Sequence, residues 1–125
     1  MGICLTWFAV LGKNPEIVCA ELGLHKTGRR LVSPWPQIAG TELAGGWYLV
    51  QRPLYECRND DVPGQLSAGA TVLSLFVEEH VMVARLECWE DGKRLWSVFH
   101  NWQEAEEHLE TDGELPAESL RFVTR

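Results

Sequence analysis

The chain has 125 residues, a length typical of one domain, so we expect residues 1–125 to form a single folding unit. Hydrophobic residues make up 46% of the chain, which excludes an intrinsically disordered protein, and no apolar run reaches the roughly 18 residues of a membrane-spanning helix. A formal net charge of −7 disfavours nucleic acid as a partner and is compatible with a basic protein partner.

The N-terminus lacks the basic segment and cleavage site of a secretory signal, so we expect a cytoplasmic protein. The four cysteines are Cys4, Cys19, Cys57 and Cys88, and none belongs to a C-x-x-C pair. Three of them lie within apolar patterns, which favours buried free thiols in a reducing compartment. Cysteine and histidine spacing also lacks a zinc pattern, and we expect neither a metal nor a cofactor.

The first elements carry clear local signals. Residues Cys4–Val10 are apolar, aromatic and β-branched, which predicts a strand. Asn14 is a natural N-cap and the following proline suits the first helical position, so we predict a helix over Pro15–Leu22. Gly23 is expected to end this helix in a left-handed cap.

Residues 25–30 (HKTGRR) form the basic cluster of the chain. Leu31 and Val32 suggest a short strand, and the two prolines in residues 33–37 predict a loop. Trp35, at the centre of this loop, is a candidate recognition residue because tryptophan is frequent at binding hot spots. The alternative, that Trp35 fills the edge of the core, stays open.

The middle of the chain predicts two strands, Trp47–Gln51 and Val72–Val77, with a short helix over Val62–Ala68 between them. Gly69 is expected to close that helix. The hairpin signal is the strongest of the chain: Asp91-Gly92 separates two apolar-rich runs, and this dipeptide is typical of a type I′ turn.

The expected two-residue turn pairs the strands in this register: Glu90 opposite Lys93, Trp89 opposite Arg94, Cys88 opposite Leu95 and Glu87 opposite Trp96. Side chains alternate between the faces of a sheet. One predicted face is a core face with Met82, Ala84, Leu86, Cys88, Leu95, Ser97 and Phe99. The other contains Val83, Arg85, Glu87, Trp89, Arg94, Trp96, Val98 and His100. We interpret this second face as the candidate binding surface, with Arg94 over Trp89 if it meets water. The alternative is that Trp96 packs under a helix.

The chain becomes acidic after Trp102, and Glu104, Glu106 and Glu107 extend the candidate binding residues. Asp112-Gly113 suggests another turn, and Pro116 suggests the start of a short terminal helix. The order of elements predicts an α+β fold, an antiparallel sheet with two helices on one face in the ferredoxin-like style.

Three segments, WFAVLGKNPEIVCAELGL, GGWYLV and VEEHVMVARLECWEDGKRLWSVFH, are informative in combination. Together they resemble a group of small uncharacterised bacterial proteins that share W-F-A-V-x-G-K-x-P-E, G-W-Y-L-V and V-E-E-H-V-M…W-x-D-G…W-S-V-x-H. The resemblance covers about the first 110 residues. It implies a bacterial, cytoplasmic origin and transfers no site residues.

Three functional hypotheses follow. The first is a non-enzymatic module of the immunity or antitoxin type, which masks a basic toxin. The second is a small-ligand domain or minor hydrolase whose pocket contains Glu78, His80, His100 or Cys57, with a carboxylate orienting an imidazole as general base. The third is a symmetric homodimer formed through the hairpin or an edge strand.

Overall fold

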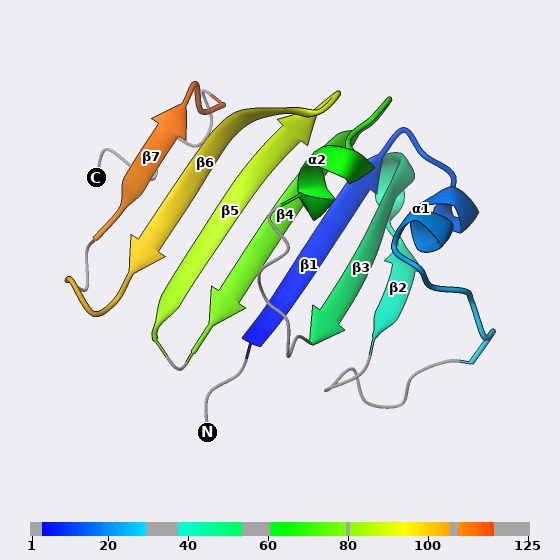
Figure 1. The fold of residues 1–125 in the computed structure, drawn as a ribbon, viewed down its shortest axis with the longest axis horizontal. Helices are drawn as coiled ribbons and strands as arrows, with labels where there is room; N and C mark the ends of the chain where they lie inside the picture. Colours follow the sequence, from blue (N-terminus) through cyan, green and yellow to red (C-terminus); the bar gives the residue numbers. More distant parts are fainter. Residues whose placement is uncertain (1–3, 30–37, 54–60, 80, 106–107, 117–125) are drawn as a thin grey trace.

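The computed structural model describes residues 4–29, 38–53, 61–79, 81–105 and 108–116. In these residues seven strands form one antiparallel sheet in the order β2-β3-β1-β4-β5-β6-β7. Both helices lie on the same face of this sheet (Figure 1). The predicted α+β class is therefore confirmed. No helix in the described part of the chain is long and apolar enough to cross a membrane.

The elements follow one another along the whole described chain. They are β1 (Cys4–Leu11), α1 (Pro15–Glu21), β2 (Ala39–Glu42), a 3-10 turn (Ala44–Gly46), β3 (Trp47–Pro53), α2 (Val62–Leu66), β4 (Thr71–Glu78), β5 (Val83–Glu90), β6 (Lys93–Asn101) and β7 (Glu110–Gly113).

Helix α1 forms where its local signals predicted. The Asn14 side-chain oxygen accepts a hydrogen bond from the Glu16 backbone N–H at 2.8 Å, which satisfies a donor that the first helical turn leaves free. Gly23 has φ +73°, and the Leu24 N–H donates to the Cys19 carbonyl at 2.7 Å. This left-handed cap ends the helix at Glu21, one residue before the predicted end.

The core lies between the helices and the sheet face that they cover. Its buried residues are Phe8, Val10, Val18, Cys19, Tyr48, Val50, Leu66, Ala70 and Val72. Val10 pairs with Val72 of β4 on one side and with Tyr48 of β3 on the other, so the core follows one continuous row across three strands.

Helix α2 is shorter than predicted and ends at Leu66 because the hairpin turn bonds to the residues after it. The Ser67 carbonyl accepts the Asp91 N–H at 2.9 Å, and the Ser67 hydroxyl accepts the Gly92 N–H at 2.7 Å while donating to the Gly64 carbonyl at 2.8 Å. The Asp91 carboxylate accepts the Gly69 N–H at 2.8 Å. This network fixes α2 against the end of the β5–β6 hairpin.

The hairpin turn is of the predicted type, and the predicted register is confirmed for the first two pairs only. Asp91 and Gly92 have φ of +51° and +81°, as a type I′ turn requires. Glu90 pairs with Lys93, and Trp89 pairs with Arg94. The next pair joins Cys88 to Trp96, so Leu95 is an extra residue and forms a β-bulge. The expected pairing of Glu87 with Trp96 is therefore wrong, and Glu87 pairs with Ser97.

Both edge strands were missed by the sequence patterns. β2 and β7 are short and mostly polar, so they lack the apolar alternation of a strand and form through pairing with β3 and β6. Asp112-Gly113, expected as a turn, lies at the end of β7, with Gly113 opposite Trp96. The strand expected at Leu31-Val32, the loop at residues 33–37 and most of the terminal helix expected from Pro116 fall outside the described residues.

The cysteines correct another expectation. Cys19 and Cys88 are buried free thiols, as predicted, but Cys4 is disulfide-bonded. Cys57 lies outside the described residues. The argument for a reducing compartment depended on free cysteines, and it loses part of its support because disulfides persist mainly in oxidising environments.

The thiol content is directly measurable. We expect iodoacetamide to label two cysteines per chain in denaturant without reductant and four after reduction, measured by intact mass. A Cys4→Ser variant, in which the bonded partner is released, should show three labels without reductant. Four labels on the unreduced chain in denaturant would show that the disulfide does not form.

Ser67→Ala removes the hydroxyl that bonds the hairpin turn. We expect the free energy of unfolding to fall by about 1–2 kcal/mol, because a partly buried backbone N–H loses its acceptor. Urea denaturation measures this change. Gln65→Ala, an exposed substitution on the same helix, is the control and should stay within about 0.5 kcal/mol. Equal midpoints for the two variants would contradict the role given to Ser67.

Candidate functional site

The bulge at Leu95 divides the predicted binding surface between the two faces of the sheet. Trp89 pairs with the core residue Val72, so the alternating residues of β5, which include Arg85 and Glu87, lie on the helix-covered face. Beyond the bulge, Trp96 pairs with Cys88, and Trp96, Val98 and His100 therefore lie on the opposite face. The alternation expected from the sequence had placed all of these residues on one face of the sheet.

The helix-side members of that surface form structural contacts. Arg94 bridges three strands: Nη1 lies 3.1 Å from Glu87 Oε2, and Nη2 lies 2.8 Å from Asp112 Oδ2. The hydrogen bond with Glu87 raises the pKa of Arg94 further. The expected contact of Arg94 over Trp89 is replaced by these pairs, and the guanidinium of Arg85 instead lies 4.9 Å from the Phe99 ring centroid.

Trp89 is not an exposed recognition residue. Its ring is partly buried and packs against the core below α2. A Cβ atom at Gly64 of α2 would lie 3.2 Å from the Trp89 ring, so the helix backbone approaches the indole closely. The alternative that Trp96 packs under a helix is wrong, because Trp96 lies on the opposite face, and it is Trp89 that α2 covers.

The other sheet face carries no described helix, and we call it the helix-free face (Figure 1). Its apolar residues come from five neighbouring strands, β3, β1, β4, β5 and β6. Alternation along these strands assigns to it Leu5, Trp7, Ala9, Leu11, Trp47, Leu49, Leu73, Leu75, Val77, Ala84, Leu86, Cys88, Trp96 and Val98. Among the described residues, its charged side chains are Glu90 and Lys93, which face each other at the hairpin turn.

The central strands carry a sequence signal for this face. An antiparallel strand with one wet face alternates apolar and polar residues, whereas β1 (CLTWFAVL) and β4 (TVLSLFVE) are apolar on both sides. Trp7 remains 38% exposed on the helix-free face. Large exposed apolar patches mark interaction sites.

A second candidate region lies where β6 ends and β7 begins. Nε2 of His108 lies 2.9 Å from Glu104 Oε2 and 3.4 Å from Glu110 Oε1, a grouping that could suggest a metal site. The Asn101 N–H donates to Nδ1 of the same ring at 2.8 Å. The neutral ring therefore carries its proton on Nε2, which has no lone pair to offer a metal and instead donates to the carboxylates.

His100 is held in place by the residues between β6 and β7. Its Nδ1 hydrogen-bonds the His108 carbonyl oxygen, and its ring forms an edge-to-face contact with Trp102 at 4.8 Å between centroids. Glu78 lies on the opposite, helix-covered face, since it pairs with Val83 and Val83 pairs with Asn101. Glu78 and His100, the two described members of the expected small-ligand site, therefore lie on different faces, and His80 and Cys57 fall outside the described residues. Trp35, Glu106 and Glu107 also lie outside them.

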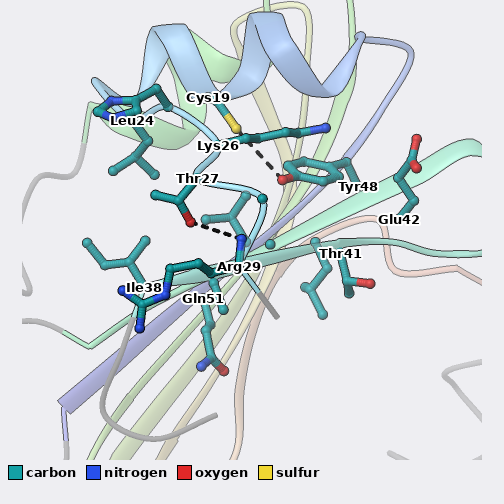
Figure 2. A pocket seen from close by; sticks show the side chains of 16 residues that line it. Cys19, Leu24, Lys26, Thr27, Arg29, Ile38, Thr41, Glu42, Tyr48 and Gln51 are labelled. Atoms are coloured by element: carbon teal, nitrogen blue, oxygen red, sulfur yellow. Dashed lines mark hydrogen bonds between the residues drawn. The ribbon is translucent and has the colours of Figure 1, made fainter. Parts of the chain in front are cut away.

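A hollow of about 1100 Å³ opens between the segment after α1 and strands β2 and β3 (Figure 2). Lys26, Arg29 and Tyr48 are among its lining residues, and its described lining contains neither Glu78 nor His100. Cys19 Sγ lies 3.7 Å from the Tyr48 hydroxyl, and Lys26 Nζ lies 5.4 Å from the Tyr48 ring centroid. The described lining also includes Cys19 and His25, but the Cys19 thiol hydrogen-bonds with the Tyr48 hydroxyl, so the hollow borders a buried tyrosine and two cations.

Comparisons with protein-family models, with curated proteins and with solved structures found no match to this chain. Its function must be inferred from its own residues.

Burial and the hydrogen bond with Cys19 raise the pKa of Tyr48 to about 12. An unfolded tyrosine ionises near pH 10, so the burial of this phenol costs stability as pH rises from about 10 to 12, where only the unfolded state releases its proton. We expect the 295 nm titration of the native protein to show one of its two tyrosines ionising late. Tyr48→Phe should remove that phase. Ionisation of both native tyrosines near pH 10 would contradict the assignment.

Proposed function

We propose that this chain is a non-enzymatic protein-binding domain of the immunity or antitoxin type, which neutralises a basic partner through its acidic end. The acidic end comprises residues 101–105 and 108–116. The observation that carries the proposal is the uneven distribution of charge. Residues 101–116 contain six of the 18 acidic side chains and none of the 11 lysines and arginines.

The acids of this end are accessible to a partner. The side chains of Glu104, Glu110 and Asp112 are 60%, 67% and 70% exposed. Glu114 is also exposed. Such a concentration of one sign of charge accelerates the association of an oppositely charged protein and suppresses unsuitable partners.

The edge of the sheet supports a defined mode of binding. β7 pairs with β6 alone among the described strands, and all four of its residues are exposed. An edge strand offers free backbone donors and acceptors, to which an extended segment of a partner can add as a further strand. The acidic side chains beside it would then favour a segment rich in lysine and arginine.

We also infer that the first part of the chain is a ferredoxin-like unit extended by three strands. The supporting observations are the element order β1-α1-β2-β3-α2-β4 and the sheet order β2-β3-β1-β4, with all pairs antiparallel. Strands β5, β6 and β7 continue this sheet beyond β4 and form the acidic end. This unit hosts many unrelated functions, so it is compatible with the binding role without requiring it.

The proposal can be tested with the product of the adjacent gene, because an immunity-type protein acts only where its toxin partner is also present. We expect that product to be basic, to inhibit growth when expressed alone and to be neutralised by co-expression of this chain. The affinity of the purified pair should fall about tenfold or more between 50 and 300 mM NaCl, as measured by calorimetry.

Two charge reversals at opposite edges of the sheet localise the interaction. Glu114→Lys, beside β7, should lower the association rate several-fold, whereas Glu42→Lys, on the exposed edge strand β2, should leave it nearly unchanged. An affinity that is indifferent to salt, or equal effects of the two variants, would reject the acidic end as the binding surface.

A further inference from the structure

The helix-free face has the composition of an interior. Cross-strand pairs place Trp7 beside Leu75, Leu75 beside Leu86 and Leu86 beside Val98, so one apolar row runs across four strands. A second row runs parallel to it and joins Leu49, Ala9, Leu73, Cys88 and Trp96. A sheet face that meets water is normally polar at these positions.

The size of the face suits a stable interface. Five strands spaced at about 4.8 Å, each about eight residues long with a rise of about 3.3 Å, give a flat footprint of roughly 600 Å². The accessible surface of protruding side chains exceeds this footprint. A standard protein interface buries about 800 Å² per partner, so the face is close to the required size.

Shape favours another sheet as the occupant. A single helix is about 10 Å wide, and one extended segment is narrower, so either would cover less than half of a face that is about 24 Å wide. Two sheets can pack face to face over their whole area at about 10 Å, with inner side chains interdigitating.

Charge favours a second copy of this chain over a basic partner. The chain carries a net charge of −7, so most approaches between two copies bring acidic surfaces together. On the helix-free face, the described charged side chains are one acidic and one basic residue at the hairpin turn, Glu90 and Lys93. Two copies can meet there without like-charge repulsion, while a basic protein would gain no electrostatic attraction.

We propose that two copies of this chain form a symmetric homodimer through their helix-free faces, with the two sheets stacked and the α1 and α2 layers outermost. This surface is separate from the acidic end, so the proposal goes beyond the proposed function and does not depend on it. The dimer encloses Trp7, Leu75, Leu86, Val98 and Trp96 of each copy in a shared apolar layer and leaves both acidic ends accessible.

Analytical ultracentrifugation and light scattering test the assembly. We expect wild-type protein at 10–100 µM to have twice the 14.2 kDa mass of the chain. Leu75→Lys places a charge near the centre of the interface and should weaken dimerisation on the order of 100-fold or more, while the circular dichroism spectrum remains that of the folded chain. Ile17→Lys, on α1 at a position 50% exposed, is the matched control and should remain dimeric.

Hydroxyl-radical footprinting of the same proteins supplies a second measurement, and Trp7→Arg supplies a second variant in case Leu75→Lys fails to fold. In the wild type, Trp7 and Trp96 should be protected, while Ile17, 50% exposed on α1, is oxidised. Trp96 should become reactive in Trp7→Arg. A monomeric wild type at 100 µM would overturn the proposal. A dimer that persists in both charge variants, or a wild-type dimer in which Trp7 and Trp96 are unprotected, would also overturn it.

Discussion

Leu95, the extra residue in β6, determines which side chains of the hairpin share a face. In its absence, Trp96 and Val98 would point toward the helices, while Ser97 and Phe99 would lie on the opposite side. The bulge reverses both assignments beyond the turn and extends the apolar rows of β1, β4 and β5 across β6. Gly113 accommodates it, because a Cβ atom at that position would overlap the Leu95 carbonyl oxygen. The bulge and the glycine together fix the pairing of β7 with β6.

The sheet that results has two different faces and one charged end. The helix-covered face buries a compact cluster between β1, β3, β4 and the two helices, and the hairpin turn is tied to α2 through Ser67. The Arg94 pairs with Glu87 and Asp112 join the last three strands on the same side. In the part of the chain that the structure describes, the helix-free face has neither such ion pairs nor a helix, and its apolar rows require a second layer to be removed from water.

The separation of these surfaces gives the two proposals a consistent physical basis. Hydrophobic association requires a large, charge-poor area, which the centre of the sheet provides. Electrostatic selection of a basic partner requires exposed acids near an accessible edge, which β7 and its flanking loop provide. A partner that adds to the edge of β7 would not compete with a second copy stacked on the helix-free face.

The sequence by itself determined the features that depend on neighbouring residues. The Asn14 cap, the Gly23 end of α1, the central strands and the Asp91-Gly92 turn all follow from preferences acting over a few residues. Tertiary structure alone decided the register beyond that turn, the edge strands β2 and β7, the bonding of Cys4 and the separation of the predicted binding residues between two faces. The physical reason is that a strand face is assigned by pairing with a distant strand, and one inserted residue reverses it without leaving a local pattern.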